Sequence, residues 1–219
     1  MEYEIRGIVL HKQDINEFDE IITIISDNGK VTFFAPGVKK VTSKNRSALL
    51  PLCLSNFEII DNEKNDLLPR LKRATLIKSI PWNTQLQQEY KDLVFFFKKI
   101  EKADCITLLN DYQEVIDDLS NNKNKVIDYI LNSLLGILGI KPRYDRCVEC
   151  NNTQNIVNFE FHKGGYLCAL HSPNNNLERH ILNALYWMNK NYWAFVEECS
   201  SNDAFYIRKM IIQYLLETT

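Results

Sequence analysis

The chain has 219 residues, 45% of them hydrophobic, with seven glycines and six prolines. This composition excludes a disordered chain and is typical of a globular protein that buries a sizeable core in one or two domains. The formal net charge of −2 does not by itself favour a nucleic-acid partner. The basic residues are clustered, however: residues 28–48 contain five and residues 69–80 contain four, with no acid in either segment.

Two features predict a cytoplasmic protein. The N-terminus lacks a charged segment followed by an apolar stretch, so we expect no secretory leader and no disulfides. The apolar runs at residues 93–97 and around Leu134 are shorter than the roughly 18 residues that a membrane span requires. Three cysteines in largely apolar or helical stretches are expected to be inert thiols: Cys53, Cys105 and Cys199.

The first 80 residues predict five strands without a helix between them. We expect strands at residues 3–11, 20–26, 31–35, 49–60 and 67–80, with the Asn28-Gly29 pair forming a hairpin turn. A polar turn is expected at residues 61–66. Five short antiparallel strands favour a Greek-key barrel of the OB type, here residues 1–80, and an SH3-like barrel remains the alternative.

Beyond Pro81 the apolar residues recur at helical spacing. Helices are predicted at about residues 86–100, 105–119 and 127–138, the last ending before Gly139 and Pro142. A further apolar stripe covers residues 177–196, and a final helix begins near Asp203. The expected fold class is therefore α+β, a barrel followed by an α-helical domain at residues 81–219.

Within the helical region, two pairs of metal-ligating residues have the spacing of a zinc finger at about residues 144–174. The pair Cys147 and Cys150 is followed after seventeen residues by the pair Cys168 and His171. Three thiolates and an imidazole suit one structural Zn²⁺ in tetrahedral coordination, which leaves no open position for chemistry. His162 lies between the pairs and remains an alternative fourth ligand.

The basic segments predict DNA contacts. The segment 36–46 joins two predicted strands and carries positive charge on a polar loop, which suits phosphate binding independent of sequence. Phe33 and Phe34 offer one face for base stacking, although alternation directs one of them into the core. The expected contact residues are Lys30, Lys39, Lys40, Lys44, Arg46, Arg70, Lys72 and Arg73.

Motifs of the common catalytic sites are missing from the sequence. It contains no phosphate-binding GxxxxGK[ST], no GxSxG elbow and no HExxH pair. The acids at Asp117 and Asp118 are helix neighbours that point to different faces, which does not suit a two-metal nuclease. We therefore expect no catalytic residues.

The order of several short motifs resembles the RecO family of bacterial recombination mediators. The N-terminal motifs are Arg6-Gly-Ile-Val-Leu10, Glu17-Phe-Asp19, Asn28-Gly29-Lys30, Gly37-Val-Lys-Lys40 with Ser43, and Leu49-Leu-Pro51. The segments Leu134–Pro142 and Gly164–Cys168 resemble the helical and zinc-finger region of the family. His171 replaces the usual fourth cysteine, and Asn151 follows the first cysteine pair where a glycine is common.

The resemblance implies an OB-fold domain and a helical domain with a zinc finger, without an active site. It also implies binding of single- and double-stranded DNA, annealing of complementary strands, and loading of RecA with RecR onto DNA coated by single-strand-binding protein. A nucleoid-associated bacterial protein follows from this function. The alternative is a zinc-stabilised adaptor that binds only proteins.

The resemblance further implies that the helical domain captures the acidic C-terminal tail of single-strand-binding protein. Such a tail requires an apolar pocket with cations at its rim, and the helix starting at Lys123 offers both kinds of residue. An ordinary buried helix is the alternative. The expected tail-binding residues are Lys123, Lys125, Tyr129, Leu134 and Leu138.

Overall fold

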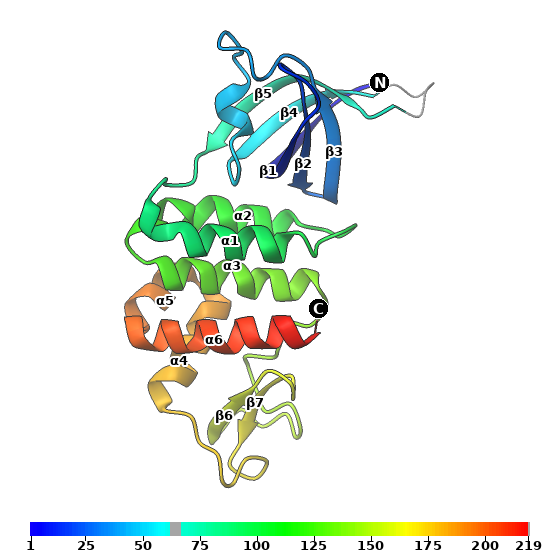
Figure 1. The fold of residues 1–219 in the computed structure, drawn as a ribbon. Coiled ribbons are helices and arrows are strands. Elements are labelled where there is room, and N and C mark those ends of the chain that lie inside the picture. The colour runs from blue at the N-terminus through cyan, green and yellow to red at the C-terminus, as the bar shows by residue number, and fades with distance from the viewer. Residues whose placement is uncertain (62–66, 219) are drawn as a thin grey trace. The chain divides into compact units, whose positions relative to one another are not determined.

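The computed structural model describes residues 1–61 and 67–218, which divide into two compact units at Asp117 and Asp118 (Figure 1). We call residues 1–117 the N-terminal unit and residues 118–219 the C-terminal unit. Both contain strands and helices, which confirms the α+β class. The turn predicted at residues 61–66 falls, apart from Asp61, outside the described residues.

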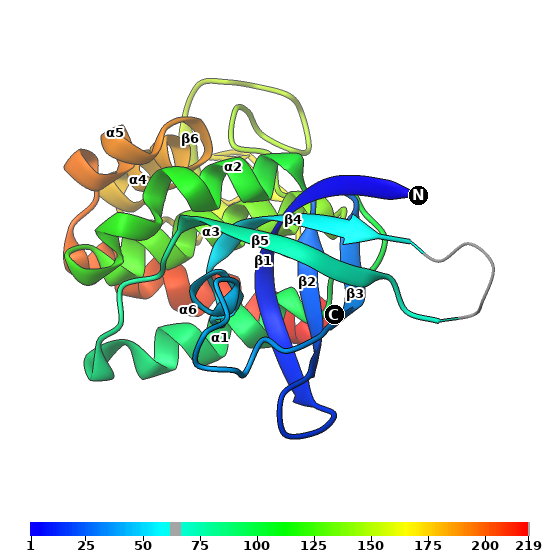
Figure 2. The same ribbon diagram turned by 90° about the horizontal axis from the view of Figure 1, so that it is seen from above.

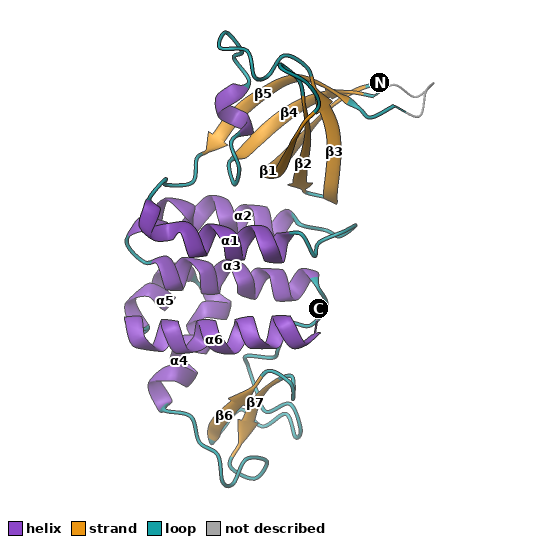
Figure 3. Ribbon diagram, viewed as in Figure 1, coloured by secondary structure: helices purple, strands orange, loops and turns teal. Residues whose placement is uncertain are grey.

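The N-terminal unit contains a closed barrel of five strands in the order β1-β2-β3-β5-β4 (Figure 3). Neighbouring strands are antiparallel except β3 and β5, which close the barrel through a parallel contact between Phe34 and Arg70. This is a five-stranded barrel of the OB type. The strands are β1 (Glu2–Asp14), β2 (Glu20–Ser26), β3 (Gly29–Ala35), β4 (Leu54–Ile60) and β5 (Arg70–Lys78).

Alternating side chains fill the barrel, as the period of two in the sequence predicts. Ile22 and Ile24 of β2 have no exposed surface, and the rings of Phe33 and Phe57 lie 5.4 Å apart inside the barrel. Figure 2 shows how the five strands curve around this core. Phe33 is therefore a core residue, and of the two predicted stacking residues only Phe34 is partly exposed.

The fourth and fifth strands are shorter than predicted. The strand expected from residue 49 begins only at Leu54, because Arg46–Leu49 forms a short 3-10 helix and Leu52 adopts a left-handed conformation with φ of 61°. Leu52 N–H donates to Val9 O at 2.7 Å, so this irregular segment still attaches to β1. Similarly, β5 begins at Arg70 rather than at residue 67.

Two helices complete the N-terminal unit, namely α1 (Gln87–Phe97), preceded by a short 3-10 turn, and α2 (Ile106–Val115). Their connecting loop is attached to the hairpin between β2 and β3: Lys30 N–H donates to Glu101 O at 2.8 Å. Gly29 at this contact has φ of 97°, and a Cβ there would lie 2.1 Å from Glu101 O, so only glycine fits. The helices α1 and α2 thus belong to the same compact unit as the barrel.

In its described residues, 118–218, the C-terminal unit contains four α-helices and a two-stranded hairpin. The apolar stripe predicted at residues 177–196 forms two helices, because Asn191 is extended and its side chain accepts a hydrogen bond from Ala194 N–H at 2.9 Å, capping the second helix. No described helix is long and apolar enough to cross a bilayer. The elements are α3 (Lys123–Ile137), β6 (Ile156–Glu160), β7 (Gly165–Cys168), α4 (Arg179–Lys190), α5 (Tyr192–Glu198) and α6 (Ser201–Thr218).

A buried carboxyl group on α3 predicts an unusual pH dependence of stability. Asp128 has no exposed surface, and neither carboxyl oxygen has a hydrogen-bond partner in the described residues. Burial raises the pKa of Asp128 well above its ordinary value of 3.8, and the charge of Arg208 opposes this only in part. The folded protein therefore keeps a proton that the unfolded chain releases, so this group lowers stability progressively as the pH rises above 3.8.

We expect the substitution Asp128→Asn to reduce this loss of stability at higher pH. The free energy of unfolding, measured by urea titration at about pH 5 and about pH 8, should decrease less with pH in the variant than in the parent. Asp145→Asn is the control. The pKa of exposed Asp145 is lowered, chiefly by its hydrogen bond with Arg146, so removing this carboxyl group should not reduce the loss of stability at higher pH. Equal pH dependence in Asp128→Asn and the parent would contradict the assignment.

Candidate metal centre and nucleic-acid interface

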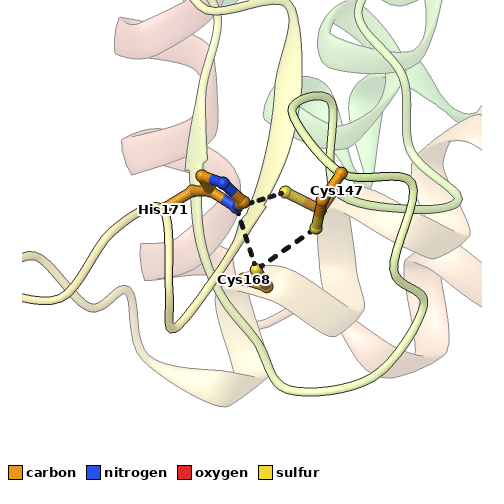
Figure 4. Close-up of side chains that lie close together, drawn as sticks. Cys147, Cys168 and His171 are labelled. Atoms are coloured by element: carbon orange, nitrogen blue, oxygen red, sulfur yellow. Dashed lines mark hydrogen bonds between the residues drawn. The ribbon is translucent and has the colours of Figure 1, made fainter.

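The four residues with zinc-finger spacing meet at one point of the C-terminal unit. The Sγ atoms of Cys147, Cys150 and Cys168 and a ring nitrogen of His171 all lie within 4.8 Å of one another. Figure 4 shows the side chains of Cys147, Cys168 and His171 converging. His171 Nδ1 is 3.3 Å from Cys168 Sγ and 3.6 Å from Cys147 Sγ. This cluster of three sulfurs and one nitrogen can hold a metal ion.

Tight turns orient each pair of ligands. In the first pair, Asn151 N–H donates to Cys147 O at 2.9 Å, and Asn151 takes the left-handed conformation with φ of 60°. Asparagine accepts this conformation better than most residues, which explains how it can occupy a turn position that usually favours glycine. In the second pair, His171 N–H donates to Cys168 O at 2.9 Å. Each turn thereby directs two donor atoms to the same side.

The hairpin β6-β7 brings the two turns together. Ile156 pairs with Cys168 at the open end of the hairpin, and Val148 N–H of the first turn donates to Tyr166 O at 2.9 Å. Cys147 and Cys168 are buried beside Leu167, whereas the side of the cluster formed by Cys150 and His171 is exposed. Backbone hydrogen bonds of the two turns and the hairpin therefore bring the four donors together.

The electrostatics of the cluster favour the ligand form of the cysteines. Burial raises the pKa of the Cys147 thiol, but hydrogen bonds from backbone N–H groups, chiefly that of Cys168, lower it more. The resulting pKa of Cys147 is about 6. The pKa of Cys168 is also lowered, chiefly by the hydrogen bond with His171. A thiolate, not a thiol, is the metal ligand, so the lowered pKa values favour the ligand form of Cys147 and Cys168, whereas the pKa of Cys150 is raised.

His162, the alternative fourth ligand, lies at the opposite end of the hairpin. Its Nε2 is 2.7 Å from a carboxylate oxygen of Glu217, and its ring packs against Tyr214 at 5.2 Å between centroids. The metal-ligand cluster includes His171 and not His162.

On the barrel, the structure divides the eight predicted DNA-contacting residues into two groups. In the first group the cation already has a close acidic neighbour: Lys30 with Glu101 at 2.5 Å, Lys39 with Asp14 at 3.0 Å, Lys72 with Glu2 at 2.7 Å, and Arg73 with Glu58 at 3.7 Å. The second group consists of exposed cations that form no ion pair within the described residues: Lys40, Lys44, Arg46 and Arg70. The second group offers more charge to a ligand.

Lys40 and Arg70 line a hollow of about 530 Å³ together with Phe18. Phe18 lies on the loop between β1 and β2, is 40% exposed, and has the Lys40 ammonium 5.4 Å from its ring centroid. Asp19 fixes this loop by accepting hydrogen bonds from Gly37 N–H at 2.7 Å and Asn16 Nδ2 at 2.9 Å. The arrangement places one accessible aromatic ring beside two cations, and the acids Glu17 and Asp19 line the same hollow.

A second hollow of about 600 Å³ continues along β5. It is lined by Lys44, Lys72 and Arg73, with Glu58 at the same site. Asn45 attaches the basic loop to the strand, since its Oδ1 accepts a hydrogen bond from Ala74 N–H at 3.0 Å. We call the exposed cations Lys40, Lys44, Arg46 and Arg70 with Phe18 the barrel surface.

Sequence reasoning missed Phe18 and misjudged α3. An apolar ring in an acidic, polar loop indicates an exposed aromatic side chain. The predicted stacking residues, in contrast, lay on a strand. On α3, Lys125 is buried and donates to Val196 O at 2.7 Å, and Leu134 has no exposed surface. These two residues belong to the core and cannot line a surface groove. Lys123 is exposed, and Tyr129 and Leu138 are partly exposed.

Two family models and several known proteins match this sequence. The family model described as Recombination protein O N terminal matches residues 1–80, and the model described as Recombination protein O C terminal matches residues 101–195. The DNA repair protein RecO of Mesoplasma florum is 28% identical, over 98% of this chain and 85% of the relative. The RecO protein of Mycoplasma mycoides is 31% identical, over 72% of this chain and 66% of the relative. The RecO protein of Ligilactobacillus salivarius is 28% identical, over 77% of this chain and 68% of the relative. Together with the fold, these matches show that the chain belongs to the RecO family of DNA repair proteins.

Proposed function

We propose that this protein is a DNA-binding recombination mediator. It binds single- and double-stranded DNA, anneals complementary strands, and acts with RecR to load RecA onto DNA coated by single-strand-binding protein. The observation that carries the proposal is the barrel surface, where the exposed cations Lys40 and Arg70 stand beside Phe18. Cations bind phosphate on any strand, and an exposed ring stacks with unpaired bases.

In this proposal the barrel surface binds DNA and does not break bonds in it. Residues 1–80 act as the DNA-binding domain, and residues 81–219 as the helical domain that contacts the C-terminal tail of single-strand-binding protein. The partly exposed residues Tyr129 and Leu138, with Lys123, remain candidates for that contact, without Lys125 and Leu134. Work on chromosomal DNA implies a location in the cytoplasm, at the nucleoid.

We further propose that the cysteine cluster holds one structural Zn²⁺ per chain. Zinc at about 2.3 Å from sulfur and about 2.0–2.1 Å from nitrogen, in tetrahedral geometry, requires S···S and S···N separations of about 3.8 and 3.6 Å. The observed Cys150–Cys168 separation is 3.7 Å, and the Cys147–His171 separation is 3.6 Å. The four donors would hold the ion and leave no position for substrate, so its role is to stabilise the finger.

An electrophoretic titration with single- and double-stranded oligonucleotides tests the proposed function. A mediator should bind both, with affinity that falls steeply as salt rises, because bound phosphates release counterions. It should also accelerate annealing of complementary strands. A chain that binds neither form of DNA at low salt would instead be a zinc-stabilised adaptor for proteins, and the proposal would be wrong.

The barrel surface predicts a selective effect of Phe18→Ala. Bases of a single strand can stack on the ring, whereas bases in a duplex are already stacked. We expect the affinity for single-stranded DNA to fall about 5- to 150-fold, the equivalent of about 1–3 kcal/mol for one stacked base. Affinity for duplex DNA should change less than about twofold, since phosphate contacts are retained.

Fluorescence anisotropy with labelled oligonucleotides measures both affinities. Ile15→Ala is the matched control, because Ile15 is an exposed apolar residue of the same loop but does not line the hollow. Equal losses for single strands and duplexes, or a similar loss in Ile15→Ala, would show that Phe18 supports the loop rather than a base.

A further inference from the structure

One exposed face of α1 combines positive charge with an aromatic ring. Lys91, Phe95 and Lys98 are spaced four and three residues apart, which places them on the same side of the helix, and all three are exposed. Phe95 is 49% exposed, and the Lys99 ammonium lies 5.2 Å from its ring centroid. With Lys102 just beyond the helix, these residues form what we call the α1 surface: Lys91, Phe95, Lys98, Lys99 and Lys102.

Acids lie close to this face, but none forms an ion pair with its lysines within the described residues. Glu89 is buried, Asp92 accepts a hydrogen bond from Gln88 Nε2 at 2.6 Å, and Asp104 accepts one from Ile106 N–H at 3.0 Å. Glu101, which follows the helix, is ion-paired with Lys30 at 2.5 Å. The ammonium groups of the α1 surface are therefore open to an anionic ligand.

The α1 surface and the barrel surface lie at opposite ends of β3. At the start of the strand, Lys30 Nζ donates to Lys98 O at 3.0 Å, which attaches this end to the C-terminus of α1. At the other end, Phe34 pairs with Arg70, and Gly37 and Lys40 follow at the barrel surface. Seven residues of strand span roughly 20 Å. Both ends belong to the same compact unit, so the spacing is fixed by the fold.

We propose that the α1 surface binds a second single strand of DNA while the barrel surface holds the first. This inference rests on the proposed function, because annealing requires one protein to bring two strands together. Two separate cationic surfaces, each with one accessible aromatic ring, provide a place for each strand. The distance between them keeps two like-charged backbones apart before the bases pair.

The spacing of the lysines favours a nucleic acid over an acidic protein. Lys91 and Lys98 are seven residues apart, about 10.5 Å along a helix. This matches about three nucleotides of stacked strand at about 3.4 Å each, with Phe95 between the two cations as a stacking platform. The exposed ring at the centre of the face offers a stacking partner to an unpaired base.

Native mass spectrometry of the full chain with a thymidine oligonucleotide of about eight residues, a length within the usual site size of one OB fold, tests the inference. The parent is expected to bind two oligonucleotides per chain. The α1 variant Lys91→Glu/Lys98→Glu and the barrel variant Lys40→Glu/Arg70→Glu should each bind one, and their combination none. The control Lys163→Glu/Lys209→Glu, which changes the net charge equally outside both surfaces, should bind two.

Annealing provides the second measurement. The α1 variant should anneal complementary strands at least about tenfold more slowly than the parent, because it retains only one strand-binding surface. Phe95→Ala, which leaves all charges in place, should lower the affinity of the second oligonucleotide about 5- to 150-fold and leave the first unchanged. All altered side chains on α1 are exposed, so we expect every variant to melt like the parent.

Each other outcome overturns the inference in a recognisable way. A parent that binds no DNA would overturn the proposed function together with it. A parent that binds one oligonucleotide, lost in the barrel variant, would leave the proposed function standing and remove only the second site. An α1 variant that still binds two oligonucleotides but loses affinity for poly-glutamate would assign the α1 surface to an acidic protein segment.

Discussion

Replacing Cys150 with serine is expected to remove zinc from the protein and unfold the finger. Serine is a poor ligand for zinc, and the remaining three donors would bind it far more weakly. Structural zinc sites contribute on the order of 10–16 kcal/mol of apparent binding free energy, which is folding free energy where the apo site has no stable structure. This exceeds the effect of most single substitutions.

Zinc content by elemental analysis and thermal unfolding by circular dichroism measure this effect. The parent should contain one zinc per chain and show a lower melting temperature after treatment with a chelator. His171→Ala should behave like Cys150→Ser, whereas His162→Ala should keep the metal, since its ring lies at Glu217 and not in the cluster. Parent protein without zinc after purification free of chelators would contradict the assignment of a structural zinc site.

The double substitution Lys40→Ala/Arg70→Ala is expected to weaken DNA binding strongly and to reduce its salt dependence. Both cations line the same hollow and form no ion pair within the described residues, so each can neutralise a phosphate. Loss of two phosphate contacts should decrease the slope of log K against log salt by about 1.8 for duplex DNA and about 1.4 for single strands.

The control for this variant is Lys12→Ala/Lys30→Ala, which removes two cations that already have close acidic partners, at 2.9 Å and 2.5 Å. Anisotropy titrations at several salt concentrations should give this control a slope close to that of the parent. If the control reduced the slope more than the Lys40 and Arg70 variant, ion pairing would not decide which cations bind DNA, and the site would have to be assigned to other residues.

The sequence allowed the barrel, the cysteine cluster and most helices to be predicted because their signals are local. Alternating apolar residues set the strands, and a CxxC turn directs two donors together regardless of the rest of the fold. Local signals fail where a single residue changes the backbone. Because Leu52 adopts a left-handed conformation, β4 begins later in the chain than predicted. Asn191 divides one apolar stripe into two helices, although the apolar pattern continues across this residue.

The availability of charges was harder to predict than their positions. A lysine in the sequence looks the same whether it faces solvent, an acid or the core. Lys30 is paired with Glu101, which is distant in the sequence, and Lys125 is buried against a carbonyl of α5. Lys40 forms no ion pair within the described residues, although Glu17 and Asp19 line the same hollow. Such differences depend on contacts between residues far apart in the chain, and the spacing of residues in the sequence does not predict these contacts.

The hairpin β6-β7 has the cysteine cluster at one end and the C-terminal helix at the other. Its tip contacts α6, where the ring of Phe161 lies 5.1 Å from that of Tyr214 and His162 pairs with Glu217 at 2.7 Å. Through these contacts, we expect binding of an ion at the cysteine cluster and fraying of the last helical turn to be coupled. Amide hydrogens at the end of α6 should then exchange faster when a chelator is added.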